Sequence, residues 1–224
     1  HDLNAMAAAI TPATKLIFIA NPNNPTGTWV ERDELEAFLA QVPEQVLVVL
    51  DEAYTEYVTD ADFPNGLNYL PQYPNVLVSR TFSKAYGLAA LRIGFAVCQP
   101  VIADVLNRVR QPFNANSLAL AAATAALGDA DYLRTSRSIN QQGMAQLEAG
   151  LEKLGLSWIP SRGNFIAVDL GRDAGPVYQA LLRAGVIVRP VAGYGMPQHL
   201  RVSIGLAEEN QRFLQALEQV LSGE

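Results

Sequence analysis

Four short apolar runs, separated by segments with helical spacing, give the first indication of how this chain folds. We expect strands near residues 15–20, 46–50, 76–80 and 93–97, because each run is apolar and short. The region from Glu31 to Val42, which lies between the first two runs, has helical spacing. Strands that alternate with helices predict an α/β fold, in which helices sandwich a mostly parallel sheet.

The pattern changes in the second half of the chain. An alanine-rich helix is expected over 116–127, a break at 128–130, and a long amphipathic helix over 131–154. Beyond it we expect strands near 164–170, 185–189 and 200–204, and helices over 174–184 and 207–221. We therefore predict two domains: a large domain over 1–130 and a small α+β C-terminal domain over 131–224.

Three of the predicted strands end in polar residues. The loop Asn21–Gly27 follows the first strand, Asp51–Tyr54 follows the second, and Thr81–Lys84 follows the third. Each has a simple alternative interpretation, as a tight turn or a solvated strand end. In open α/β sheets, ligands bind at the carboxyl ends of the strands. The joint occurrence of these three polar segments therefore predicts one ligand-binding crevice.

Lys84 is one of three lysines in the chain, with Lys15 and Lys153, and it alone has phosphate-binding residue types around it. An aldehyde cofactor needs a neutral amine, and burial or a nearby cation moves a lysine toward that state. Arg92 can supply the cation, and its donor fork also matches a phosphate. Hydroxyls for the remaining phosphate oxygens come from Thr81 and Ser83. The pattern favours a lysine that carries pyridoxal phosphate, although a lysine after a strand is commonly a solvated charge.

These residues resemble the fold-type I, pyridoxal phosphate-dependent aminotransferases of class I and II. The resemblance rests on Asn24-Pro25-Thr26-Gly27, Asp51-Glu52-Ala53-Tyr54, Ser83-Lys84-Ala85-Tyr86-Gly87-Leu88 and Arg92-Ile93-Gly94. Within the family, the chain is most similar to the histidinol-phosphate aminotransferases, through residues 21–28, Gly163–Phe165, Val188–Pro190 and Leu200–Gly205. The resemblance implies a histidinol-phosphate:2-oxoglutarate aminotransferase of histidine biosynthesis, and it implies a homodimer.

The resemblance also implies a role for each matching residue. Lys84 would carry the cofactor and then act as the general base at the substrate α-carbon. Asp51 would keep the pyridine nitrogen protonated, so that the ring accepts electrons. Tyr54 and Asn24 would hydrogen-bond the phenolic oxygen of the cofactor. The cofactor phosphate would be bound by Thr81, Ser83 and Arg92.

The later part of the chain contains the candidate substrate anchors. Arg189 ends one apolar run and Arg201 begins another, so two guanidinium groups on neighbouring strands could clamp an anion. Arginines at strand ends are commonly just solvated. The resemblance implies that Arg201 binds the substrate carboxylate, and that in histidinol-phosphate enzymes this pocket takes the substrate phosphate with help from Arg189. Asn164 is a weaker candidate for the same contact.

Composition excludes several other classes of function. The net charge of −6 argues against nucleic acid or an anionic membrane surface as the main partner. The two histidines, His1 and His199, give no metal-ligand cluster, and Cys98 has no second cysteine for a disulfide. No apolar run approaches the ~20 residues of a membrane span. We expect a cytoplasmic protein, and the family resemblance implies that its partners are an amino donor and a 2-oxo acid.

The chain begins at His1 without a methionine. In the resembling family a further segment precedes this point, so we expect the chain to lack part of the large domain. That segment would carry a phosphate-binding helix N-terminus, an aromatic ring that stacks on the cofactor, and a tyrosine lent to the partner subunit. The alternatives are a truncated, catalytically silent chain, an aromatic amino acid aminotransferase and, more distantly, a phosphothreonine decarboxylase of the same fold.

Overall fold

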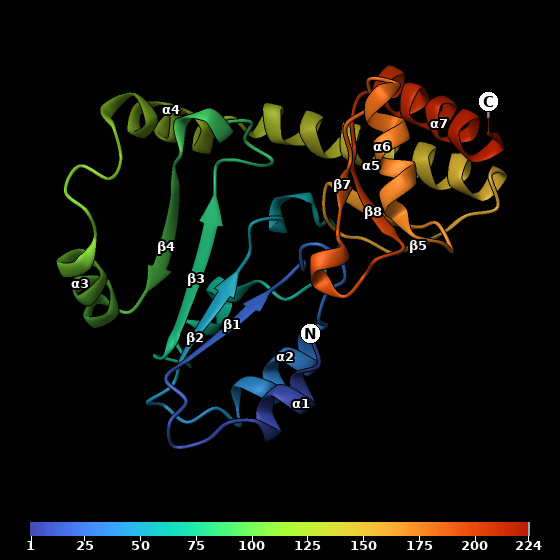
Figure 1. The fold of residues 1–224 in the computed structure, drawn as a ribbon. Coiled ribbons are helices and arrows are strands. Elements are labelled where there is room, and N and C mark those ends of the chain that lie inside the picture. The colour runs from blue at the N-terminus through green and yellow to red at the C-terminus, as the bar shows by residue number, and fades with distance from the viewer. Residues whose placement is uncertain (224) are drawn as a thin grey trace. The chain divides into compact units, whose positions relative to one another are not determined.

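The computed structural model describes residues 1–223 and divides into two compact units (Figure 1). The large unit comprises His1–Asn23 and Trp29–Arg134, and the small unit comprises Asn24–Thr28 and the residues from Thr135 onward. A short loop of the N-terminal half, residues 24–28, is therefore part of the small unit. Each unit has its own sheet and its own core.

The sheet of the large unit carries its strands in chain order: β1 (Leu16–Ala20), β2 (Leu47–Asp51), β3 (Val76–Thr81) and β4 (Gly94–Cys98). The β1–β2 and β2–β3 pairs are parallel, and the β3–β4 pair is antiparallel. The predicted mostly parallel sheet of an α/β fold is confirmed.

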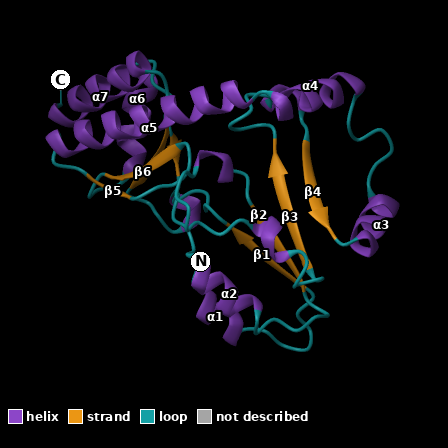
Figure 2. Cartoon of the chain, turned by 180° about the vertical axis from the view of Figure 1, so that it is seen from behind, coloured by secondary structure: helices purple, strands orange, loops and turns teal. Residues whose placement is uncertain are grey.

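Helices α1 (Leu3–Ala8) and α2 (Arg32–Leu39) cover one face of this sheet (Figures 1 and 2). Alternate strand residues such as Ile19 and Val48 are fully buried on that face, because successive side chains of a strand point to opposite sides. On the other face of β1, Phe18 is 61% exposed. The remaining helical elements of this unit are η1 (Thr55–Tyr57), η2 (Gly66–Tyr69), η3 (Ala89–Leu91), α3 (Pro100–Val109) and α4 (Ser117–Gly128).

The small unit has an antiparallel sheet in the order β5 (Ser157–Ile159), β6 (Phe165–Asp169), β8 (His199–Ser203) and β7 (Arg189–Pro190). Its helical elements are α5 (Ala130–Lys153), whose first turn belongs to the large unit, α6 (Ala174–Arg183), η4 (Ala192–Tyr194) and α7 (Ala207–Ser222). Side chains of β6 and β8 that face the helices, such as Ile166 and Leu200, form the core. The alternate residues, among them Arg201, lie on the opposite face.

Two details of this sheet differ from the sequence expectation. The strand expected at 185–189 is the short β7, because its ladder with β8 joins just Arg189 to Arg201 and Pro190 to Leu200. Strand β5 was not expected, since Ser157–Ile159 is too short to show a clear period. In addition, no helix within residues 1–223 is long and apolar enough to cross a membrane.

Candidate active site

The carboxyl end of β2 presents Asp51 and Tyr54. Asp51 is the last residue of the strand, between Ala20 of β1 and Ser79 of β3, and its side chain is exposed. Its Oδ1 accepts a hydrogen bond from the Ala53 backbone N–H at 3.2 Å. Tyr54 is 6% exposed and precedes η1. The strand end therefore holds an accessible carboxylate close to a packed phenol.

Lys84 follows β3 in a turn that the surrounding residues hold in place. Its Nζ lies 5.5 Å from the centroid of the Tyr54 ring, and its carbonyl oxygen accepts the Gly87 N–H at 2.9 Å. Gly87 has φ +72°, and a Cβ at this position would lie 2.4 Å from the Tyr132 hydroxyl oxygen. Phe82 anchors the start of the turn by packing against Tyr86, with ring centroids 5.0 Å apart. The turn thus presents an exposed amine beside the Tyr54 ring.

The expected phosphate-binding residues also come together. Arg92 Nη1 donates to Ser83 Oγ at 3.4 Å and to the Ala89 carbonyl oxygen at 2.8 Å. The Ser83 N–H donates to Thr81 Oγ1 at 3.0 Å. Arg92 has φ +53°, a left-handed conformation that costs about 1 kcal/mol or more in a residue other than glycine. Hydroxyl and guanidinium donors beside one amine are the set that an aldehyde bearing a phosphate requires, so these residues fit pyridoxal phosphate.

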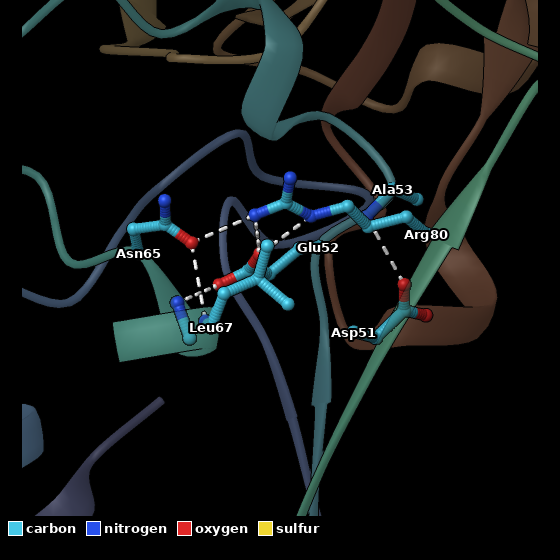
Figure 3. A network of polar contacts seen from close by, with 7 residues as sticks. Asp51, Glu52, Ala53, Asn65, Leu67 and Arg80 are labelled. Atoms are coloured by element: carbon cyan, nitrogen blue, oxygen red, sulfur yellow. Dashed lines mark hydrogen bonds and ion pairs between the residues drawn. The ribbon is translucent and has the colours of Figure 1, made fainter. Parts of the chain in front are cut away.

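A buried polar network that was not expected from the sequence lies behind these strand ends (Figure 3). Glu52 is 2% exposed, and its Oε2 accepts from Arg80 Nε at 3.0 Å and from Arg80 Nη2 at 2.7 Å. Its Oε1 accepts from the Gly66 N–H at 2.6 Å, and Asn65 Oδ1 accepts from Arg80 Nη2 at 2.8 Å. Burial raises the pKa of Glu52, although Arg80 opposes this change. The signal for this network in the sequence was a pair of opposite charges, Glu52 and Arg80, at the ends of two successive predicted strands.

In the small unit, the two predicted substrate arginines are direct partners in the sheet. Arg189 of β7 lies opposite Arg201 of β8, so both side chains leave the same face. Arg201 donates to Asn24 Oδ1, and its Cζ lies 5.1 Å from the centroid of the Phe165 ring. Asn164 is half-buried, and its carbonyl oxygen accepts the Ile204 N–H at 2.9 Å. The structure therefore joins Asn24 to Arg201, a contact between residues that the sequence analysis assigned to different ligands.

The loop that carries Asn24 is fixed against the segment before β6. The Gly27 carbonyl oxygen accepts the Arg162 N–H at 2.9 Å. Gly27 has φ +77°, and a Cβ there would lie 2.0 Å from Ser161 Oγ. The glycine of the Asn-Pro-Thr-Gly motif is thus required both by backbone conformation and by close approach.

The family model described as aminotransferase class I and II matches residues 1–217, and the chain belongs to this family. It is 72% identical to histidinol-phosphate aminotransferase 2 of Pseudomonas aeruginosa and 61% identical to histidinol-phosphate aminotransferase 1 of Nitrosococcus oceani; each match covers 99% of this chain.

Solved structures agree with this assignment. The crystal structure of histidinol-phosphate aminotransferase from Sinorhizobium meliloti in complex with pyridoxal-5'-phosphate superposes with a TM-score of 0.91 and 34% identity, over 99% of this chain and 62% of that one. The predicted resemblance to aminotransferases of this type is confirmed. The chain spans 60% of the length of the two curated relatives named above.

Proposed function

We propose that this chain acts as a pyridoxal phosphate-dependent aminotransferase that moves an amino group between histidinol phosphate and 2-oxoglutarate in histidine biosynthesis. The observation that carries the proposal is the grouping of the Lys84 amine, the Tyr54 ring and the Ser83–Arg92 pair at one edge of the sheet. The names of the relatives at 72% and 61% identity support the choice of substrate.

Pyridoxal phosphate, when bound, supplies an aldehyde that takes up an amine and a ring that accepts electrons from the substrate α-carbon. Lys84 would hold the cofactor, and its amine would be the base that removes the proton from the substrate α-carbon. The Asp51 carboxylate holds a proton at the ring nitrogen. Tyr54 and Asn24 hydrogen-bond the phenolic oxygen, and the phosphate is bound by Thr81, Ser83 and Arg92.

Arg201 and Arg189 bind the anionic group of the substrate. Their positions opposite one another on β8 and β7 support this role, because two forks on one sheet face suit a phosphate dianion. Asn164, which precedes Phe165 in the chain, donates a hydrogen bond to the same anionic group of the substrate. Within the small unit, Asn24 Oδ1 accepts a hydrogen bond from Arg201, which orients that guanidinium group.

The assembly and location follow from the family resemblance. We propose a homodimer in the cytoplasm, in which the partner subunit completes the cofactor site. Size-exclusion chromatography with light scattering tests the dimer, and a monomer that retains full activity would overturn it.

The decisive experiment for the function is covalent capture. The protein is incubated with pyridoxal phosphate, reduced with borohydride, and mapped by mass spectrometry. Stoichiometric label on Lys84, with Lys15 and Lys153 unmodified, is expected. Label spread over all three lysines, or no label, would instead favour a catalytically silent chain.

Substrate choice is then tested in single-turnover reactions of the loaded protein. Histidinol phosphate and glutamate should each convert the bound cofactor to its amine form, which is followed by absorbance. Phenylalanine is the comparison, because an aromatic amino acid aminotransferase is the alternative. Faster conversion with phenylalanine than with histidinol phosphate would overturn the proposed substrate.

A further inference from the structure

We propose that the ion pair between Glu52 and Arg80 is a positioning device that sets the separation of Asp51 and Thr81, and so the fit of the cofactor between them. The inference rests on the proposed function, which assigns the ring nitrogen to Asp51 and the phosphate to Thr81.

Each member of the pair is the chain neighbour of a site residue. Glu52 follows Asp51 at the end of β2, and Arg80 precedes Thr81 in β3. Successive side chains in a strand point to opposite faces, so the pair lies behind the face that carries the site. A Cβ on Gly66 would meet Glu52 Oε1 at 2.6 Å and Val78 Cγ2 at 2.8 Å, which places the Glu52 carboxylate beside a residue of the buried core.

Several short contacts fix the pair. Both Arg80 donors converge on Glu52 Oε2, at 3.0 and 2.7 Å, while Glu52 Oε1 accepts from Gly66 at 2.6 Å. Asn65 receives the second bond of Arg80 Nη2 at 2.8 Å and also accepts the Leu67 N–H at 3.1 Å, which ties the network to η2 (Figure 3). The Glu52 N–H bonds to the Ser79 carbonyl oxygen at 2.9 Å, so the strands are joined through backbone and side chains together.

Stability alone does not account for this arrangement. The side chains of Glu52 and Arg80 are 3% and 15% exposed, and the desolvation of such a pair offsets much of its Coulombic attraction. A guanidinium fork supplies a fixed geometry instead. Asp51, by contrast, is exposed, and its Oδ1 accepts the N–H of Ala53 two residues along the chain, so its position depends on the backbone that Glu52 anchors.

The test uses the pyridoxal phosphate-loaded protein and the variants Arg80→Lys and Glu52→Gln. Arg80→Lys keeps the charge and removes the fork, and Glu52→Gln keeps the size and loses one acceptor oxygen. Each is expected to weaken pyridoxal phosphate binding about tenfold, by analogy with metal sites, where loss of a residue that orients a ligand costs about 10- to 100-fold. Each should also raise the pH midpoint of the visible absorption of the cofactor on Lys84. A displaced Asp51 would no longer keep the ring nitrogen protonated. Without that positive charge in the ring, the nitrogen that joins Lys84 to the cofactor would keep its own proton to higher pH.

Asn75→Ala is the matched control. Asn75 Nδ2 donates to the Val46 carbonyl oxygen at 2.8 Å, so it joins the same two strands at their amino ends. This variant should lower the unfolding midpoint and leave the pH midpoint of the absorption unchanged. If Arg80→Lys and Asn75→Ala affect cofactor affinity and pH midpoint equally, the pair is merely structural and the inference is wrong.

The experiment separates this inference from the proposed function. Wild-type protein that fails to capture the cofactor on Lys84 overturns the proposed function, whereas normal capture with unchanged variants overturns the positioning role alone. Should Arg80→Lys fail to fold, Asn65→Ala is measured in the same way; it removes one Arg80 contact and the Leu67 cap bond, and it keeps the Glu52–Arg80 pair. A pH midpoint that stays at the wild-type value in Asn65→Ala would then count against the inference.

Discussion

Arg189 and Arg201 lie directly opposite one another on the antiparallel strands β7 and β8. Directly opposed residues have Cβ atoms about 4.5–5.5 Å apart, and like charges in such positions destabilise a sheet. Arg201 is supported by its bond to Asn24 and by the Phe165 ring, while Arg189 is exposed. A bound anion would relieve the repulsion between the two guanidinium groups.

Inorganic phosphate should therefore stabilise the protein. We expect the thermal unfolding midpoint to rise in phosphate relative to chloride of equal ionic strength, with a gain of about 2.7 kcal/mol at a phosphate concentration 100 times Kd. Arg201→Ala should abolish the gain and Arg189→Ala should reduce it. Arg172→Ala, which removes an exposed arginine of the same unit, is the control. A gain that survives in Arg201→Ala would contradict the clamp.

Gly27→Ala should destabilise the small unit more than Gly171→Ala does. Both glycines have positive φ, so each substitution carries backbone strain of about 1–2 kcal/mol. A Cβ at Gly27 also meets Ser161 Oγ at 2.0 Å, whereas a Cβ at Gly171 meets nothing within 4 Å. The overlap should add about 1–3 kcal/mol, measured by urea unfolding. Equal losses for the two variants would show that the Gly27 contact is unimportant.

Arg80→Met should make stability fall more steeply with rising pH. Burial already raises the pKa of Glu52 in the folded protein. The stability that this group contributes is therefore present below its pKa in the unfolded chain, about 4.3, and is lost as pH rises through its pKa in the folded protein. Removing Arg80 removes the partner that opposes the increase, so the pKa rises further and the loss toward pH 8 becomes larger. Urea unfolding between pH 5 and 8 measures the slope.

The control for this prediction is the double variant Glu52→Gln with Arg80→Met, which has no titrating group at either position. Its stability should show less pH dependence than that of Arg80→Met. A slope equal to that of Arg80→Met would assign the pH dependence to another group.

Arg92→Lys should weaken binding of pyridoxal phosphate but not of pyridoxal. Arg92 lies 3.4 Å from Ser83 Oγ and offers a fork that lysine lacks. Loss of a hydrogen bond to a charged group costs about 1.5–3 kcal/mol, which corresponds to roughly 10- to 150-fold in Kd. Fluorescence titration with the two ligands gives the comparison. A parallel loss of pyridoxal affinity would mean that Arg92 supports the fold of the turn and not the phosphate.

Much of the large unit could be predicted from local pattern. The apolar runs at 15–20, 46–50, 76–80 and 93–97 became β1 to β4, because a buried strand requires a short continuous apolar segment and leaves a clear signal. The polar residues at the ends of β2 and β3 were recognisable for the same reason: Lys84, Asp51 and Tyr54 stand where strands stop. Opposite burial of neighbouring residues, as in Phe18 and Ile19, also follows from the period of a strand.

The direct contacts between residues that are distant in the sequence could not be predicted. Local sequence specifies the strands, the turn residues and the chemical types of the site residues, because each of these depends on a few consecutive residues. The sequence indicated that Arg189 and Arg201 lie on neighbouring strands, but folding of the whole chain sets them directly opposite one another. It also joins Asn24 to Arg201 and Glu52 to Arg80. Such contacts join residues far apart in sequence, and their existence depends on register and packing, which no local pattern encodes.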